Sequence, residues 1–391
     1  MRIHRLVAHR VSVPLRRRVQ HASFAREESE NIVVVCELDD GTRGYGEGVP
    51  RTYVTGEDAT QSLALLTQIP WKRMLAEADC SSFAEVVLWL DGRPWPGIAQ
   101  DMRQCFGHAA RCALELAILD AYGRAFAEPL SAVTRYASPR LYAPRAQVQY
   151  SGAITSSRGI KAATLAWAMR WYGFAHLKVK VGIAGQDDRQ RLRWVRAGAG
   201  PHMDIRVDAN EAWDEHEAVE KIRQLLPYRI SVVEQPLPHR SAAALATLRR
   251  RVPVAIMLDE SLCSLADAEQ AVRGQWCDFF NIRLSKCGGF IPSLKLVAFA
   301  AEHGIRCQLG CQVGETALLS AAGRHFASSV AGLVYCEGSY DRRLLAQNLS
   351  EQDITFGRGG WAPALTGPGL GISVAEDALD RLTVCREVLF E

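Results

Sequence analysis

Charged residues recur at the ends of apolar, β-branched runs in the second half of this 391-residue chain. Successive positions lie roughly 25–30 residues apart, which matches the length of one strand–helix unit. The charged positions, in chain order, are Lys178, Lys180, Asp208, Glu234, Asp259 and Lys286. Because the carboxyl ends of consecutive parallel strands meet at one face of a barrel, we expect these side chains to converge. Such a cluster would hold a divalent metal ion between two groups able to transfer protons.

Lys178 and Lys180 alternate with apolar residues in the segment HLKVKVG. Side chains two residues apart on a strand point the same way, so both ammonium groups should face the barrel interior. Two solvated surface lysines are the plain alternative, which the apolar neighbours disfavour. Adjacent cations lower each other's pKa, so a neutral amine base becomes attainable near neutral pH.

Three carboxylates each end a candidate strand: Asp208 in RVDANEAW, Glu234 in VVEQPL and Asp259 in IMLDES. Hard carboxylate oxygens suit Mg²⁺, with Mn²⁺ as an alternative, and the lack of a neighbouring histidine or cysteine disfavours zinc. Any one of them could instead cap a helix or form a salt bridge, but three in consecutive units favour a shared site. Three neighbours are expected to orient or support these ligands: Asn210, Gln235 and Glu260. Glu260 follows Asp259 directly and should point away from it.

Lys286 precedes a Cys-Gly-Gly turn at the end of the next strand but one after Glu234. In an eight-stranded barrel the second and sixth strands lie on opposite sides. Lys180 and Lys286 would then face each other across the metal site. Two bases on opposite faces of one carbon are what a racemase or epimerase requires, because one removes a proton and the other returns it.

The elements that must position these residues follow a strand–helix rhythm from about residue 140 to residue 360. Eight strand candidates alternate there with amphipathic segments: RAQVQYSGAI, FAHLKVKV, DIRVDA, ISVVEQ, VAIMLD, FFNIRLS, IRCQLGC and AGLVYCEG. No GxGxxG turn follows an early strand, so an open doubly wound sheet fits less well. The pattern predicts an α/β fold built on a (β/α)₈-type barrel, a modified TIM barrel.

The first 130 residues have a different, α+β character. Residues 2–14 alternate as a strand does, and NIVVVCEL and RGYGEGV form a predicted hairpin around an Asp-Gly turn. Helical patterns follow, strongest in FGHAARCALELAILDAYGRAFAEPL. We therefore expect an N-terminal capping domain over 1–130, a catalytic barrel over 140–360, and a C-terminal segment over 361–391 that returns to the capping domain and completes it.

The segments KVK, DAN, EQP, DES and KCGG, in this order and spacing, resemble those of the enolase superfamily. More narrowly, they resemble the muconate lactonizing enzyme subgroup of its mandelate racemase/muconate lactonizing enzyme proteins. The resemblance also covers GTRGYGEGVP, ALELAILDAYGRA and the closing GPGLG, so it spans nearly the whole chain. It implies a Mg²⁺ held by Asp208, Glu234 and Asp259, with Lys180 and Lys286 as acid/base groups and Lys178 as the electrostatic partner of Lys180. The shared chemistry that it implies is removal of the proton α to a carboxylate, giving a metal-stabilised enediolate.

The leading expectation is a racemase or epimerase of a small carboxylic acid. A muconate-type cycloisomerase or an acid dehydratase, in which one lysine is the base and the other is electrostatic, is the alternative. A non-catalytic barrel used for binding is the remote alternative. Dipeptide epimerases of the subgroup tend to hold the substrate ammonium with an Asp-x-Asp near the eighth strand. Here YCEGSYDRRLL offers Glu337 and Asp341 but no such pair, which disfavours a dipeptide substrate.

In the resembled family two capping loops decide specificity, and they correspond to about residues 15–31 and 47–58. The first is basic, with Arg16, Arg17, Arg18, His21 and Arg26. A second anionic group on the substrate would explain this charge, and a solvated basic loop explains it equally well.

Several residues are candidates to line the substrate pocket: Phe24, Tyr53, Val54, Cys311, Gln312, Glu315 and Glu337. Glu337 could meet a cation or hydroxyl of the substrate. A salt bridge with Arg342 or Arg343 is the equal alternative for Glu337.

The composition sets outer limits on function. A net charge of +3 is too small to indicate nucleic-acid binding, and no nucleic-acid module is recognisable. The eleven cysteines are scattered without a CxxC pair, which favours buried free thiols in a reducing compartment. The N-terminus lacks the apolar core of a signal peptide, and no apolar stretch reaches the ~18 residues of a membrane span. We expect a cytoplasmic homo-oligomer whose partner is a small-molecule carboxylate.

Overall fold

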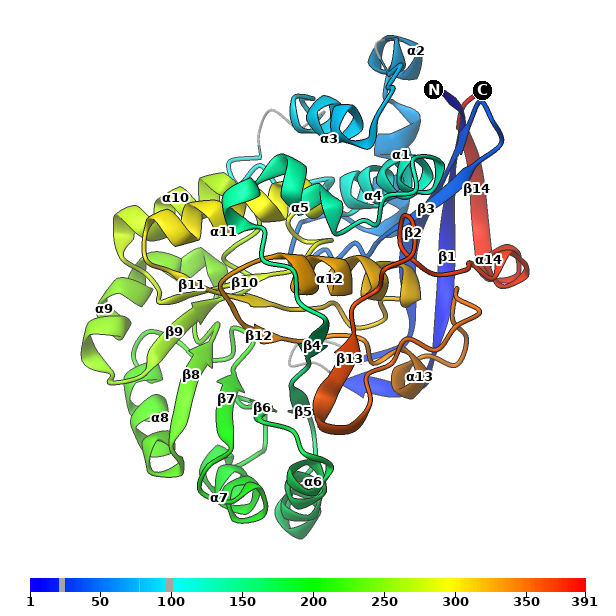
Figure 1. The fold of residues 1–391 in the computed structure, drawn as a ribbon. Coiled ribbons are helices and arrows are strands. Elements are labelled where there is room, and N and C mark those ends of the chain that lie inside the picture. The colour runs from blue at the N-terminus through cyan, green and yellow to red at the C-terminus, as the bar shows by residue number, and fades with distance from the viewer. Residues whose placement is uncertain (21–24, 77, 96–100) are drawn as a thin grey trace.

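The computed structural model describes the chain apart from residues 21–24, 77 and 96–100. Two sheets dominate it, one antiparallel and four-stranded, the other parallel and eight-stranded (Figure 1). All eleven cysteines are free, as expected, and nine of them are buried. No helix among the described residues is both long and apolar enough to cross a membrane.

The four-stranded sheet brings the two ends of the chain together. Its order is β14-β1-β2-β3, and its strands are β1 (Ile3–Gln20), β2 (Ala25–Leu38), β3 (Arg43–Gly48) and β14 (Thr383–Phe390). Figure 1 shows both termini side by side at this sheet, because β14 pairs antiparallel with β1. The expectation that the C-terminal segment completes an α+β capping domain is therefore confirmed.

The first predicted capping loop is mostly strand. β1 and β2 keep pairing beyond the alternating residues, with Val19 opposite Arg26. The pairing shifts register between Pro14 and Val19. Proline has no N–H to donate to the ladder, which accounts for the interrupted pairing. The alternating sequence pattern therefore predicted that the strand ends at residue 14.

Five helices follow the hairpin before the barrel begins. They are α1 (Ala59–Thr67), α2 (Trp71–Leu75), α3 (Phe83–Asp91), α4 (His108–Ala125) and α5 (Ala132–Ala137). α4 is buried on nearly every side and lies against β3. Three glycines at alternate positions of β3 make this approach possible, because a Cβ at Gly46 would overlap the backbone of Ala113 and Ala117 in α4.

Gly46→Ala should destabilise the protein by about 1–3 kcal/mol or more, because the added methyl group meets backbone atoms that have no room to move. Chemical denaturation of the variant would measure the change. Gly323→Ala in α12 (Ala317–Ser329) is the matched control, since its Cβ would meet nothing closer than 3.8 Å. Replacing this helical glycine should be neutral or slightly stabilising. Equal midpoints for the two variants would contradict the close-packing account.

The eight-stranded parallel sheet forms the predicted barrel. Its order follows the chain, and its strands are β5 (Gly152–Ile154), β6 (His176–Lys180), β7 (Asp204–Asp208), β8 (Ile230–Glu234), β9 (Ala255–Leu258), β10 (Phe279–Ile282), β11 (Arg306–Leu309) and β12 (Leu333–Cys336). The amide of Ser151 donates to the carbonyl of Cys336 at 2.8 Å and links the first strand to the last. All eight strand candidates are thus confirmed.

One candidate is divided in two. The segment predicted as the first barrel strand contains β4 (Gln147–Gln149) and β5, and β4 pairs antiparallel with β13 (Trp361–Pro363) instead of joining the barrel. Helices cover the outside of the barrel (Figure 1). They are α6 (Gly159–Tyr172), α7 (Asp188–Ala199), α8 (Ala218–Leu225), α9 (Leu245–Arg251), α10 (Leu265–Gly274), α11 (Phe290–Glu302) and α12 (Ala317–Ser329). Two short helices follow, α13 (Asp341–Leu344) and α14 (Glu376–Leu382).

Buried polar contacts fix the capping sheet on the barrel. Glu47 of β3 accepts hydrogen bonds from the amides of Thr316 and Leu319, at 3.0 and 3.1 Å, at the N-terminus of α12. A carboxylate is favourable there, because unpaired N–H groups and the helix dipole meet it. Burial raises the pKa of Glu47 to about 7 despite these donors. The contact holds the capping domain at one place over the barrel rim.

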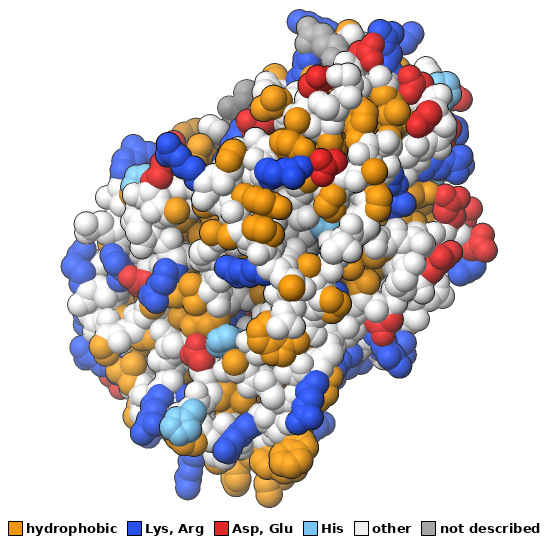
Figure 2. Space-filling model, viewed as in Figure 1, with side chains coloured by type: hydrophobic (Ala, Val, Ile, Leu, Met, Phe, Trp, Pro, Cys, Tyr) orange, Lys and Arg blue, Asp and Glu red, His pale blue; other side chains and the backbone are white. Residues whose placement is uncertain are grey.

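The outer surface carries one apolar feature of note. Trp167 and Trp171 of α6 stack on each other and are 55% and 74% exposed. Figure 2 shows apolar side chains at the lower end of the molecule, where Figure 1 places α6. This face lies away from the carboxyl-end rim of the strands and plays no part in positioning the charged cluster.

Candidate active site

The sheet register sets three of the predicted residues in a row. Lys180 is the partner of Asp208 across β6 and β7, and Asp208 is the partner of Glu234 across β7 and β8. Asp259 follows directly after β9, at the same edge of the barrel. The convergence of lysines and carboxylates that the sequence predicts is therefore present at the C-terminal rim.

Lys178 lies at the centre of the carboxylates and is only 7% exposed. Its Nζ is 2.7 Å from Glu234 Oε1, 3.1 Å from Asp208 Oδ2 and 3.2 Å from Glu337 Oε2. Burial alone would lower the pKa of Lys178, but these three carboxylates raise it well above the usual value. The expectation of a neutral amine from adjacent cations is thus wrong for Lys178, because its nearest charged neighbours are anions.

Lys180 faces the same way from the same strand but is more open. Its Nζ lies 3.5 Å from Asp208 Oδ2 and donates to Asn210 Oδ1. Its side chain is 23% exposed and lines a cavity at the barrel rim. Lys178 also lines this cavity, and Lys180 is the more exposed of the two lysines.

Lys286 lies deeper than the sequence indicates. β10 ends at Ile282, so Lys286 sits in the turn before α11 and not at a strand end. Its side chain is 0% exposed, and its Nζ donates to Asp259 Oδ1 at 2.9 Å and to the carbonyls of Asp259 and Asn281 at 2.7 and 2.9 Å. Burial would lower the pKa of Lys286, and Asp259 outweighs it and raises the pKa. In this arrangement Lys286 does not line the cavity that Lys180 lines.

Two arginines complete the cluster, and the sequence reasoning missed both. Arg283 forms an ion pair with Asp259 and lies 3.8 Å from Glu234 Oε1. Arg206 is fully buried and contacts Glu337 Oε1 at 2.7 Å. Arg206 stands two residues before Asp208 on β7, so the period of the strand was a signal that it shares the inward face.

The three residues expected to support the ligands have distinct contacts. The Oε1 atom of Gln235 accepts from the amides of Asp259 and Ser261, at 2.9 and 3.2 Å, and so ties β8 to the loop after β9. Asn210 donates its amide N–H to Asp208 Oδ1 at 3.0 Å and its side-chain N–H to Glu260 Oε1 at 3.2 Å. Glu260, which was expected to point away from Asp259, lines the same cavity, whereas Asp259 does not.

The cavity lies between the barrel rim and β1 of the capping domain and encloses about 340 Å³. Five of the predicted pocket residues line it: Tyr53, Cys311, Gln312, Glu315 and Glu337. Val54 does not, because it packs instead with Cys105 and Cys263 in a small apolar cluster. Phe24 lies outside the described residues. Glu337 pairs with Lys178 and Arg206, so neither Arg342 nor Arg343 is its partner.

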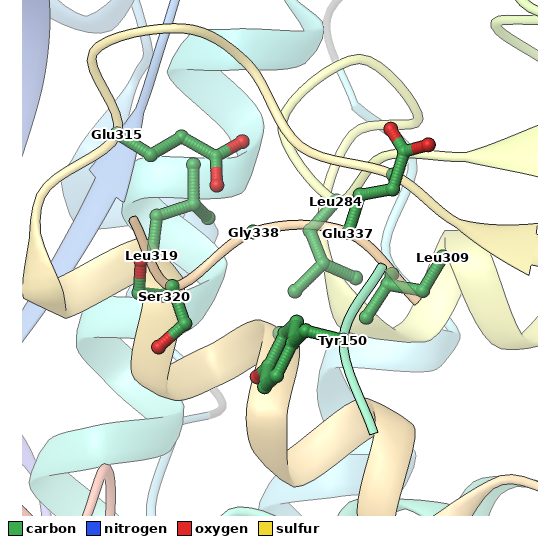
Figure 3. A pocket seen from close by; sticks show the side chains of 11 residues that line it. Tyr150, Leu284, Leu309, Glu315, Leu319, Ser320, Glu337 and Gly338 are labelled. Carbon is green, nitrogen blue, oxygen red and sulfur yellow. The ribbon is translucent and has the colours of Figure 1, made fainter. Parts of the chain in front are cut away.

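A second, water-sized void of about 10 Å³ lies beside this cavity and shares Glu315, Ser320 and Glu337 with it. Figure 3 shows Glu315 and Ser320 on one side of the void, Leu309 on the other, and Tyr150 beneath. Burial raises the pKa of Glu315 to about 8. The floor of the cavity therefore holds a carboxyl group that is largely uncharged near neutral pH.

A divalent metal ion fits this site in donor chemistry. Within the described part of the chain, the buried Glu234 Oε2 has no hydrogen-bond partner, and the buried Asp208 Oδ2 has only the ion-pair contacts of Lys178 and Lys180, at 3.1 and 3.5 Å. Such an oxygen is costly unless a cation satisfies it. The described carboxylates do not, however, converge on one point as a formed metal centre would. Lys178 and Arg283 lie between them and supply the positive charge.

Comparison with known proteins decides the family. Residues 161–378, more than half of the chain, match the family described as "Enolase C-terminal domain-like". The chain belongs to the enolase superfamily. Solved structures of this superfamily overlay the barrel and the capping domain together, since the alignments cover nearly the full length of both chains.

Three relatives illustrate the activities found around this chain. An N-succinyl-L-Arg/Lys racemase from Bacillus cereus is 28% identical in sequence over 392 residues, which cover 100% of each chain. The crystal structure of the N-succinyl Arg/Lys racemase from this organism superposes with a TM-score of 0.83 at 26% identity. That superposition covers 99% of this chain and 100% of the racemase chain. A hydrophobic dipeptide epimerase from Enterococcus faecalis is 28% identical over 78% of this chain and 80% of its own. Its structure with Mg and L-Leu-L-Tyr gives a TM-score of 0.80 at 26% identity, covering 95% and 100%. Muconate cycloisomerase 1 from Rhodococcus opacus is 26% identical over 95% and 96% of the two chains.

The relatives agree with the predicted class, since they are racemases, epimerases and cycloisomerases. The expectation of an enolase-superfamily isomerase is confirmed at that level. The relatives act on different compounds, as their names say, so the compound that this chain converts has to be argued from its own residues.

Proposed function

We propose that this protein removes the proton α to the carboxylate of a small acid and returns a proton to the same carbon, as a racemase or epimerase does. The observation that carries the proposal is the position of Lys180. It lines the cavity 3.5 Å from Asp208, at the edge of the row of buried carboxylates. A base at this position can reach the α-proton of a substrate whose carboxylate is attracted by the cations Lys178 and Arg283.

The proposed cofactor is Mg²⁺, with Mn²⁺ as the alternative, and Asp208, Glu234 and Asp259 would hold it. When bound, it would supply a Lewis acid that stabilises the negative charge developing on the substrate carboxylate. The α-proton of a carboxylate is very weakly acidic, so this stabilisation is what makes its removal accessible. Gln235 and Asn210 would hold the backbone and side chain of these carboxylates in position.

The lysines divide the proton transfer. Lys180 would take the proton from one face of the α-carbon. Lys178, held charged by three carboxylates, would stabilise the enediolate without titrating. Lys286, whose Nζ contacts Asp259 Oδ1 at 2.9 Å, would return a proton from the opposite face.

A cycloisomerase or dehydratase is the second candidate, and one observation favours it. Lys286 is fully buried, its Nζ donates to three protein oxygens, and it does not line the cavity. If it keeps these partners during turnover, only Lys180 acts as a base and Lys286 is electrostatic. A barrel used only for binding would need neither lysine.

Proton exchange with solvent tests the proposal. Incubation of the Mg²⁺-loaded protein in D₂O with single enantiomers of acid sugars and N-acylamino acids, with dipeptides and with muconates should replace the α-proton of a reactive acid. Proton NMR follows the exchange, and chiral chromatography follows conversion between enantiomers. Exchange together with conversion supports a racemase or epimerase, whereas exchange without conversion supports one-base chemistry. A folded, Mg²⁺-loaded protein that exchanges none of these acids would contradict the proposal.

The remaining expectations stay predictions. A small-molecule carboxylate is the proposed partner, and the protein is proposed to be a cytoplasmic homo-oligomer. The domain limits at residues 130, 140 and 360 are likewise proposed boundaries.

A further inference from the structure

We propose that the substrate carries a second anionic group, which binds at an arginine-lined end of the cavity formed by Arg17, Arg18 and Arg343. This inference rests on the proposed function and names the substrate class of the same site. Arg17 and Arg18 belong to β1 of the capping domain, and Arg343 belongs to α13, which follows β12. All three line the cavity that also contains Lys180.

These arginines differ from the deeper cations in having no acidic partner. Lys178, Arg206 and Arg283 are each neutralised by carboxylates of the cluster. Within the described residues, neither Arg17, Arg18 nor Arg343 forms a salt bridge. An arginine without a carboxylate partner at a cavity wall is ready to take one from a ligand, because its planar fork matches carboxylate geometry.

Arg343 is also positioned by its neighbours. Its guanidinium carbon lies 5.0 Å from the centre of the Phe356 ring and 5.7 Å from that of Tyr172. Contact with aromatic rings restrains the side chain and leaves the N–H groups at its edge free to donate. The guanidinium is therefore held at the wall of the cavity without its hydrogen bonds being used by an acid of the protein.

Of the acidic residues at the same walls, Glu315 offsets little of this charge. Burial raises the pKa of Glu315 to about 8, and burial raises the pKa of Asp341 to about 6, with Ser320 donating to Asp341 at 2.6 Å. Glu315 is thus mostly neutral at pH 7. The outer part of the cavity keeps a positive potential, which attracts an anion and repels a substrate cation.

The partners of Glu337 also favour a substrate that carries a second anionic group. Glu337 is the carboxylate after the eighth barrel strand, where a substrate ammonium group would need an anion. Both of its oxygens are already paired, with Lys178 at 3.2 Å and Arg206 at 2.7 Å. A free α-amino group would find no unpaired carboxylate there. The favoured substrate is therefore a carboxylate with no free ammonium group, joined to a second carboxylate.

A pair of matched probes tests the subsite. N-succinylglycine and N-butyrylglycine have the same α-carbon and the same chain length, but only the first has a second carboxylate. Calorimetry with the Mg²⁺-loaded protein should show N-succinylglycine binding on the order of 10- to 100-fold tighter, the range expected of charge-assisted hydrogen bonds. Exchange of the two enantiotopic α-protons in D₂O measures proton abstraction from the same two compounds.

Variants with matched controls assign the effect to residues. Arg343→Gln, and separately Arg17→Gln with Arg18→Gln, should remove most of the preference for N-succinylglycine. Arg16→Gln and Arg342→Gln should leave it unchanged, because neither Arg16 nor Arg342 lines the cavity although each neighbours a residue that does. Arg342 already pairs with Asp353 at 3.2 Å.

The outcomes separate the subsite from the reaction. Equal binding of the two probes, or tighter binding of glycylglycine, would overturn the subsite. Exchange of both probes at equal rates would overturn it and leave the proposed function standing. Selective binding without exchange of any probe would keep the subsite and count against the function. Consumption of cis,cis-muconate with the same arginine dependence would identify the second carboxylate as that of a diene diacid, whereas exchange of N-succinylglycine alone would place it on an acyl group.

Discussion

Lys180→Ala should lower α-proton exchange for one enantiomer of a reactive substrate by on the order of 10²–10⁴-fold, the usual contribution of a positioned acid/base group. Lys286→Ala should have the mirror effect on the other enantiomer. Each variant should lose interconversion of the enantiomers, because each lysine supplies one of two required proton transfers. NMR in D₂O with separate enantiomers measures exchange, and chiral chromatography measures conversion.

Two control variants make this result specific. Lys180→Arg keeps the positive charge but cannot release a proton, so it should be as inactive as Lys180→Ala. Lys221→Ala removes an exposed lysine of α8 and should behave as the unmodified protein. If Lys286→Ala keeps exchange with both enantiomers, the two-base mechanism is wrong. Lys286 would then act electrostatically, which its buried contact with Asp259 allows. A cycloisomerase or dehydratase would then be the favoured function.

Much of the barrel could be predicted because its strands are short apolar runs, three of which end in a candidate site residue. His176–Lys180 and Asp204–Asp208 show this directly, since the last side chain of each strand reaches the rim. The two-residue period of a strand also placed Lys178 beside Lys180 on the inward face. Local pattern and tertiary position coincide in these strands, which is why the prediction holds.

Prediction failed where pairing with a distant segment overrides the local pattern. The basic segment after Pro14 reads as a loop because its side chains are exposed, yet its backbone pairs with β2 as far as Gln20. The contact of β3 with α4 was also missed. Gly44, Gly46 and Gly48 look like turn residues until the helix against which they pack is known.

The carboxylates of the site were predictable, but their partners were not. A carboxylate at the end of a predicted strand indicates a position at the barrel rim. The cation that neutralises it depends on which strands are neighbours in the folded barrel. Arg206 pairs with Glu337 across the closed barrel, although 131 positions separate them in the chain. A sequence shows no such pairing, so contact with the substrate and a salt bridge with Arg342 or Arg343 stayed equal alternatives for Glu337.

These partners change what metal removal should do. Treatment with EDTA should abolish turnover, and Mg²⁺ should restore it, because no other group at the site can stabilise the charge on the substrate as well. The cooperative melting transition should nevertheless remain. Lys178, Arg283 and Lys286 already compensate the buried carboxylates in the absence of metal, so removing the ion does not leave unpaired charges in the core. Proton exchange in D₂O measures turnover during chelation and readdition, and circular dichroism measures the melting transition. Unfolding on chelation would contradict this account of the cluster, and full turnover of a demonstrably metal-free sample would contradict the cofactor.

Asp208→Asn extends the same prediction to a single ligand. The change removes the charge of a buried carboxylate of the proposed ligand set, so it should weaken Mg²⁺ binding strongly. Lys178 would keep Glu234 and Glu337 as partners, so the fold should survive. Asp204→Asn is the control, because Asp204 lies at the other end of β7 and accepts a hydrogen bond from Tyr335. Calorimetric titration with Mg²⁺ should separate the two variants. Equal affinities would remove Asp208 from the proposed ligand set, because two aspartates on one strand would then be indistinguishable to the metal ion.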